Sequence, residues 1–382
     1  MKKYFLLSLS VMVCFIVFSS SKPVTQKSKP KSKSGINMNN LDKSVSPATD
    51  FYQYACGGWM KANPLKPEYS RYGSFDVLGE NNQKQLKDLV TKLAAQKNEK
   101  GTVAQKVGDL YKIGMDTVTI EKQGAQPIQG QLQEIANMNK GQLTNQLAQM
   151  ELDGLNPFFG LFGSADPDNS SMKIAYLWQS GLGIGDRDYY LEKDQQNIRN
   201  EYVKLMTKMF AISGYSKMVG YQGRESELAQ KVLALETCIA QITIDKTTLR
   251  DPYKTIHKCT PADFQQMIPA IDVNSYMRTL KVNVDTVNVG MPTFFTSLND
   301  IISISDFDVI KAYLAWNVIN AAAPYLSSDF VNADFDFYGK VLSGKVVNQD
   351  RWKRTINTVD GCLGEALGQM YVKNYFPAEA KA

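Results

Sequence analysis

Apolar residues recur at helical spacing along most of the chain. Between residues 81 and 96 they fall at i, i+3, i+4, i+7 and i+8, which is the spacing of one buried helix face. The same period predicts helices at 103–115, 198–212 and 225–240. The chain is therefore expected to be mainly helical.

Helix-start signals add to this pattern further along the chain. Thr260 is a good N-cap, Pro261 suits the first helical turn, and Asp263 stands three residues after the cap. A helix is therefore expected to begin at this point. Two more are expected at 305–325, with a break at Pro324, and at about 348–371.

Strand signals are few. Short apolar runs at 158–162 and 172–177 flank a polar turn at 166–169, which predicts a β-hairpin. Alternating valines at 282–289 predict one more extended segment. The expected fold class is mainly α, with a large multi-helix lobe and a small β-hairpin.

The first residues have the pattern of a secretory signal peptide, predicted at 1–21. Lys2 and Lys3 precede an apolar run from Tyr4 to Phe18, and small serines follow it. The run is short for a membrane span, so we expect no stable span after cleavage; an uncleaved anchor is the alternative interpretation. Export then places the protein in the periplasm, the cell envelope or the extracellular space.

A second stretch, 22–48, is rich in Ser, Lys, Pro and Asn and predicts a flexible tether. The whole chain has a net charge of +5, but eight lysines and a single acid lie before residue 46. The remainder is slightly acidic, which speaks against a nucleic-acid partner. Because no shift in composition divides residues 49–382, we expect them to form one domain.

The predicted export bears on the state of the cysteines, because exported proteins meet oxidising conditions in which disulfides can form. The four cysteines after the signal segment are far apart and show no C-x-x-C pattern, which speaks against a zinc knuckle. One or two disulfides and buried free thiols both remain open. The four are Cys56, Cys238, Cys259 and Cys362.

The chain contains a single histidine, His257, and this count excludes most metal and triad chemistry. A zinc peptidase of the H-E-x-x-H type needs two histidines one helical turn apart and a glutamate base. His257 is followed by Lys258, so we expect a surface or packing residue there. No catalytic or metal-binding residue is predicted in this chain.

Two other patterns favour a structural interpretation. The glycine run 181–185 has no clear βαβ context, so it is a weak candidate for a nucleotide site. The carboxylate pairs Asp166 with Asp168 and Asp186 with Asp188 are more simply turn or cap features than acid/base couples.

Short motifs follow one another in a fixed order from residue 50 to residue 372. They are D-F-Y-Q-Y-A-C-G-G-W (50–59), S-R-Y-G-S-F-D (70–76), D-L-Y with G-M-D (109–116), Q-S-G-L-G (179–183), D-R-D-Y-Y-L (186–191), L-E-T (235–237), R-D-P (250–252), R-W-K-R (351–354) and G-E-A-L-G-Q-M-Y-V (364–372). Each is weak alone, but the ordered set is specific. It resembles the N-terminal region of the zinc metallopeptidases that include neprilysin, endothelin-converting enzyme and bacterial oligopeptidase O.

That resemblance implies a function as well as a fold. Members of the family are exported or membrane-anchored zinc endopeptidases that cut small peptides, and two helical lobes enclose their central cavity. The C-terminal region of those enzymes carries the zinc ligands, whereas this chain resembles the non-catalytic lobe. The chain is therefore expected to be a truncated or split form that binds no cofactor itself and is inactive alone. An interrupted polypeptide and one half of an enzyme with a separate C-terminal catalytic chain both stay open.

Two substrate-binding residues are carried over from the resemblance. In the family, the arginine and aspartate of the R-Y-x-x-F-D stretch belong to a subsite on the primed side of the scissile bond, and here they are Arg71 and Asp76. A guanidinium can hold a peptide carboxylate through two hydrogen bonds, and a nearby acid can orient it. The simpler interpretation is that Arg71 is a solvated charge and Asp76 a first-turn helix residue.

The resemblance also bears on two structural segments. In animal members the cysteine that matches Cys56 pairs with one in the C-terminal part, so here Cys56 is free or paired differently. The segment 186–191 is given a structural role, with Tyr189 and Tyr190 packing in the helical lobe.

Two alternatives to a split peptidase stay open. One is a stand-alone exported module that binds peptides without cutting them. The other is a structural envelope protein, which has no positive feature beyond the lysine-rich tether. Retained aromatic residues at 51–75 favour the peptidase interpretation over the first alternative, because a free surface there would have become polar.

Overall fold

The computed structural model describes residues 36–377 and 379. The predicted signal peptide, 1–21, and most of the predicted tether therefore lie outside the described residues. The last part of that tether, 36–48, is described and contains the 3-10 turn η1 (Met38–Asn40). The domain boundaries predicted from sequence stay predictions.

The described segment 36–64 is built around helix α1 (Phe51–Ala62), which Asp50 caps by accepting the Gln53 N–H at 2.9 Å. The chain before α1 crosses it at the glycine pair of the C-G-G-W motif. A Cβ atom on Gly58 would lie 2.3 Å from the Asn39 carbonyl oxygen. The two glycines are therefore required by this close crossing.

Helices dominate from residue 65 onward, as the sequence predicts, and the expected mainly α fold class is confirmed. They are α2 (Ser74–Ala95), α3 (Val103–Met115), α4 (Thr117–Gln123), α5 (Gln129–Asn137), α6 (Leu143–Leu152), α7 (Asp188–Leu191), α8 (Gln196–Ile212), α9 (Tyr215–Met218), α10 (Glu225–Ile242), α11 (Pro261–Met267), α12 (Val273–Thr279), α13 (Pro292–Ile304), α14 (Phe307–Ala322), α15 (Ser328–Asp334), the π-helix η8 (Phe335–Val341) and α16 (Arg351–Tyr375). Shorter 3-10 turns are η2 (Gln126–Ile128), η3 (Lys140–Gln142), η4 (Lys193–Gln195), η5 (Thr248–Arg250), η6 (Pro252–Lys254) and η7 (Ala323–Tyr325).

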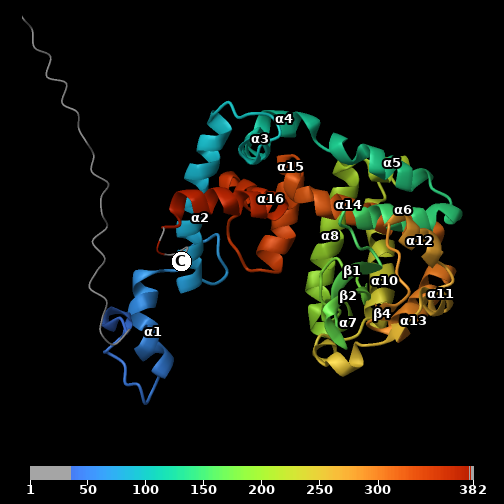
Figure 1. Cartoon of the computed structure of the whole chain (residues 1–382), viewed down its shortest axis with the longest axis horizontal. Coiled ribbons are helices and arrows are strands. Elements are labelled where there is room, and N and C mark those ends of the chain that lie inside the picture. Colours follow the sequence, from blue (N-terminus) through green and yellow to red (C-terminus); the bar gives the residue numbers. More distant parts are fainter. Residues whose placement is uncertain (1–35, 378, 380–382) are drawn as a thin grey trace, which may run out of the picture. The chain divides into compact units, whose positions relative to one another are not determined.

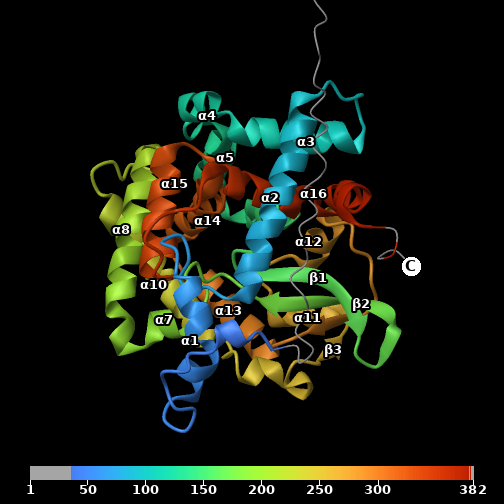
Figure 2. The same ribbon diagram turned by 90° about the vertical axis from the view of Figure 1, so that its left-hand side faces the viewer.

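A small sheet has the strand order β1-β2-β4-β3. Its strands are β1 (Phe159–Asp166), β2 (Asn169–Gln179), β3 (Lys258–Cys259) and β4 (Val287–Val289). Strands β1 and β2 form the predicted antiparallel hairpin (Figure 2), whereas β4 pairs with β2 in parallel and with β3 antiparallel. The expected extended segment at 282–289 is confirmed only over its last three residues.

The sheet and the helices from α5 to α14 enclose a large core, which we call the main lobe (117–341). Helix α14 is buried on most of its faces, as expected for a central helix. Aromatic rings fill the space beside the sheet: Phe295 contacts Phe159, Phe264 and Phe294 at centroid distances of 5.0–5.5 Å. These edge-on contacts are the favoured geometry for packed rings.

A second, smaller core is formed by α2, α3 and α16, which we call the three-helix module (Figure 1). Gly108 lets α3 approach α2 closely, because a Cβ there would lie 2.8 Å from the Leu93 carbonyl oxygen. Gly114 similarly faces Thr355 of α16. Helix α16 is kinked at Leu363, which has non-helical backbone angles. The buried residues of this core are Leu86, Leu89, Val90, Leu93, Val107, Tyr111, Ile356, Val359 and Leu367.

Helix ends follow the capping signals. Thr260 and Asp263 form the predicted capping box at the start of α11. The helix expected from residue 305 is α14, capped by Asp306, and it gives way to η7 around Pro324. The helix expected from 348 begins only at Arg351, with Asp350 at the N-cap position.

The four cysteines of the described residues are all free, so of the two possibilities left open by the sequence, disulfides are not formed among them. The interpretation as buried thiols is wrong for Cys238 and Cys362, which are exposed on their helices. Cys56 and Cys259 are half-buried, and burial raises the pKa of the Cys259 thiol.

Candidate functional site

The two predicted substrate-binding residues lie where a loop, 65–73, leads into α2. Asp76 occupies the first turn of the helix, and its Oδ2 accepts the Gly73 N–H at 2.7 Å. Asp76 thus has the helix-capping role that its position predicts. No contact between Asp76 and Arg71 is present among the described residues.

Arg71 is exposed, and within the described residues its guanidinium makes no hydrogen bond or ion pair. Other charged residues of the same loop are paired. The free guanidinium therefore keeps all of its donors available for a ligand.

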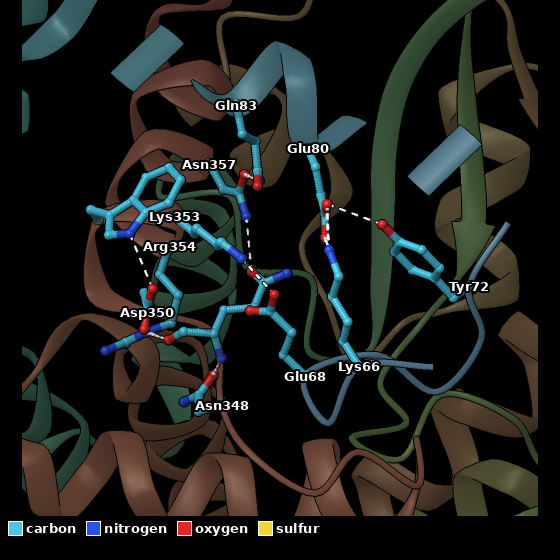
Figure 3. A network of polar contacts seen from close by, with 12 residues as sticks. Lys66, Glu68, Tyr72, Glu80, Gln83, Asn348, Asp350, Lys353, Arg354 and Asn357 are labelled. Carbon is cyan, nitrogen blue, oxygen red and sulfur yellow. Dashed lines mark hydrogen bonds and ion pairs between the residues drawn. The ribbon is translucent and has the colours of Figure 1, made fainter. Parts of the chain in front are cut away.

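One end of the loop is tied to α2. Lys66 donates to both carboxylate oxygens of Glu80, at 2.5 and 2.6 Å, and the Tyr72 hydroxyl donates to Glu80 at 3.0 Å (Figure 3). Burial alone would raise the pKa of Glu80, but the bonds from Lys66 and Tyr72 outweigh it and lower that pKa. The bond to Glu80 raises the pKa of Lys66. Both groups are therefore held in their charged forms.

The same loop is also tied to the segment around the start of α16. Lys353 of α16 donates to Glu68 at 2.5 Å, and these side chains are only 12% and 16% exposed. The Pro67 carbonyl accepts the backbone N–H groups of Val346 and Val347, at 2.9 and 3.1 Å. Figure 3 shows Lys66 and Glu68 reaching to different helices. The loop is thus fixed from two sides.

A groove of about 320 Å³ runs between α2 and α16, with Asp76 on its wall and Arg71 outside its lining. The structure therefore does not bring the two predicted residues into one pocket. Gln83 donates to Asn357 across the groove at 3.2 Å, and Phe75 at its rim is 86% exposed. The other lining residues are Tyr69, Gly79, Glu80, Asn82, Leu86, Gln349, Ile356 and Asp360.

The carboxylate pairs noted in the sequence are turn features, as expected. The N–H of Asp168 donates to Asp166, and the N–H of Asp188 donates to Asp186. Lys258 pairs with both Asp166 and Asp168. These contacts explain the acids without any catalytic role.

His257 is an exposed residue, one of the two expectations from sequence, and the glycine run 181–185 is partly packed. The backbone N–H of His257 donates to the side chain of Asn288 at 2.7 Å, next to β4. Gly183 has no room for a side chain, because a Cβ there would lie 1.9 Å from the Tyr202 hydroxyl. Gly181 and Gly183 are thus packed into the main lobe, whereas Gly185 at the end of the run is exposed.

A buried carboxyl group, Glu236 of α10, was missed by the sequence analysis. Tyr190 and Tyr202 donate to its two oxygens at 2.8 and 3.2 Å, and Trp316 donates to the Tyr202 hydroxyl at 2.7 Å. Burial raises the pKa of Glu236 to about 8, against the opposing effect of these hydrogen bonds. The expected packing role of Tyr190 is confirmed, since it is 4% exposed. A signal existed in the sequence: Glu236 lies on the apolar stripe of its helix.

The described residues do not fit a zinc ion. Within 36–377 and 379, no group of three or more His, Cys, Asp or Glu side chains is arranged to hold a metal. No helix in the same part of the chain is both long and apolar enough to cross a bilayer.

Comparison with known proteins decides the family. The sequence-family model described as peptidase family M13 matches residues 47–382 of this chain. This chain belongs to peptidase family M13. The resemblance inferred from the ordered motifs is thereby confirmed, and family M13 consists of zinc metallopeptidases.

The M13 relatives are much longer than this chain. Endothelin-converting enzyme 1 of Cavia porcellus is 30% identical over 358 residues, which cover 90% of this chain and 46% of that protein. Membrane metallo-endopeptidase-like 1 of Mus musculus is 27% identical, over 90% of this chain and 48% of that protein. The chain thus spans about half the length of the curated relatives it matches.

Solved structures agree with this M13 assignment. The zinc metalloprotease Zmp1 of Mycobacterium tuberculosis, in complex with an inhibitor, superposes with a TM-score of 0.84 at 25% identity, over 90% of this chain and 52% of that one. A PepO structure from Lactobacillus rhamnosis, at 18% identity, has a TM-score of 0.74 over 88% of this chain and 53% of that one. The latter likeness concerns the fold alone.

Proposed function

We propose that this chain is the N-terminal, substrate-enclosing part of an exported M13 zinc endopeptidase that acts on small peptides. The observation that carries the proposal is Arg71, an unpaired guanidinium on a loop whose other charges are paired. An arginine of this kind suits the free C-terminal carboxylate of a short peptide, which it can hold through two charge-assisted hydrogen bonds. Asp76 is proposed to face the same substrate from the groove wall.

Hydrolysis requires a second part, because the described residues offer no zinc site. We propose that a C-terminal catalytic part supplies the zinc ligands, as a separate chain or as the remainder of a split protein. Exposed apolar side chains at the start of α2 favour such a partner: Phe75 is 86% and Leu78 is 64% exposed. The proposal includes export directed by the predicted signal peptide, 1–21. It also includes the flexible tether predicted at 22–48.

The alternative is a stand-alone peptide-binding module. It is supported by the groove between α2 and α16, which exists without a second part. Co-expression with an M13 catalytic part separates the two. Zinc-dependent peptide cleavage by the mixture supports the split enzyme, whereas unchanged binding without cleavage supports the module.

The substrate-binding role of Arg71 is tested with one peptide made as the free acid and as the C-terminal amide. We expect the full chain to bind the acid on the order of tenfold more tightly, because only the acid offers Arg71 a carboxylate. Arg71→Ala should abolish that preference, measured by titration calorimetry. The matched control is Arg278→Ala, which removes an exposed arginine of α12 in the main lobe. Equal affinities of the unaltered chain for acid and amide would overturn the role.

A further inference from the structure

We infer that the Glu68–Lys353 and Lys66–Glu80 ion pairs are positioning residues for Arg71, which they hold ready to receive a peptide carboxylate. The inference rests on the proposed function and goes beyond it by assigning roles to four residues of the loop, α2 and α16. Neither pair contains Arg71 or Asp76.

The contacts of three consecutive residues define the clamp. Lys66 forms an ion pair with Glu80 of α2, and Glu68 forms one with Lys353 of α16. Between them, the Pro67 carbonyl accepts hydrogen bonds from the backbone N–H groups of Val346 and Val347. The loop is thereby attached to two helices that are far apart in the sequence but pack in one core. It cannot shift on one helix without breaking its contacts to the other.

Arg71 lies between residues that are fixed on both sides of it in the sequence. Glu68 is fixed before it, and Tyr72 and Gly73 are fixed after it by their bonds to Glu80 and Asp76. The backbone that carries Arg71 therefore has few conformations to lose when a ligand binds. Such pre-organisation increases affinity by reducing the ordering cost of binding, and the long side chain itself remains free to adjust.

Low exposure distinguishes the Glu68–Lys353 pair from ordinary surface pairs. Glu68 and Lys353 are 16% and 12% exposed, whereas the Lys340–Asp336 pair on η8 is 51% and 56% exposed. The Lys66–Glu80 pair is intermediate, because Glu80 is 12% but Lys66 43% exposed. Exposed pairs fix side chains only weakly, because water and salt screen them. Shielded, charge-assisted pairs hold a fixed geometry more strongly.

The test measures the acid-to-amide preference of the full chain with the same peptide pair. Lys353→Met should reduce the preference from about tenfold to about threefold or less, mainly by weakening binding of the acid. On the α16 side the loop then keeps only the backbone bonds of Pro67, and Glu68 loses its partner. Glu68→Gln should act in the same direction. The exchange Glu68→Lys with Lys353→Glu restores the pair with reversed charges and should recover most of the preference. Lys340→Met is the matched control and should change nothing.

A purely structural pair would give another result. Lys353→Met would then lower the melting temperature while the folded protein kept its full acid preference, and that outcome overturns the inference while Arg71 retains its role. Where Lys353→Met fails to fold, Glu80→Gln serves as the second variant, because it weakens the other half of the clamp. Absence of any acid preference in the unaltered chain overturns the proposed function and this inference together.

Discussion

The main lobe and the three-helix module reach a fixed geometry by different means. In the main lobe, aromatic rings and a central buried helix form one large core, and even its buried carboxyl group is enclosed by tyrosines. The module has a small core of nine buried residues, and ion pairs at its margin hold the loop 65–73. The candidate binding residues belong to the smaller region. A binding loop can therefore be held by shielded charges where apolar burial is limited.

The largest expected effect tests the main lobe alone. Phe295→Ala should lower the free energy of unfolding by about 3–5 kcal/mol, because it removes a fully buried ring from an aromatic cluster. Chemical denaturation measures the loss. The remaining folded protein should keep its preference for the free-acid peptide, since Phe295 lies outside the module. Loss of that preference together with stability would show that the two regions are not independent.

A pH series tests the buried carboxyl group. The folded-state pKa of Glu236 is about 8 against an ordinary value of 4.5, so native Glu236 keeps a proton that the unfolded chain releases. Its contribution to stability is full below about pH 4.5 and is lost as the pH rises to about 8. Glu236→Gln should flatten this decline, which we expect to be on the order of a few kcal/mol.

The control for that series is Glu227→Gln, on an exposed part of the same helix, which should leave the decline unchanged. Asp334 adds a smaller slope of the same sign, because burial raises its pKa to about 6. An identical slope in the original chain and in Glu236→Gln would mean that Glu236 is ionised in the folded state.

A smaller effect tests the packing of the module. Gly108→Ala should destabilise by about 1–3 kcal/mol, because the new methyl group would meet the α2 backbone at 2.8 Å. Gly130→Ala in α5 has open space and should be neutral or stabilising by up to about 1 kcal/mol. Thermal melting of the two variants compares them directly. Equal effects would imply that α2 and α3 can separate without cost.

Local features of this fold could be predicted from sequence. The period of apolar residues located α2, α3, α8 and α10, and the polar turn at 166–169 located the hairpin. Capping chemistry is local too, so the box at Thr260 and Asp263 was visible without the structure. These elements are determined by neighbours a few residues apart.

Long-range features could not be predicted in this way. The parallel pairing of β2 with β4 and the contact of Glu68 with Lys353 join segments that no local pattern connects. Arg71 was found only through the family resemblance, because an isolated exposed arginine has no distinctive pattern. The valines at 282 and 284 had strand-like alternation, but only 287–289 lie beside another strand.

Because α16 packs on α2 and α3, the small core of the three-helix module can be completed only at the end of synthesis. Translation delivers α2 and α3 first, then the whole of the main lobe, and only afterwards α16. The main lobe can fold while synthesis continues, whereas α2 and α3 must wait with apolar side chains uncovered. Nascent chains interrupted before residue 351 should therefore be recognised by chaperones or proteases through α2 and α3. The loop that carries Arg71 is made early and can be tied to α2 at once, but it gains its second anchor, Lys353, only when α16 has been made.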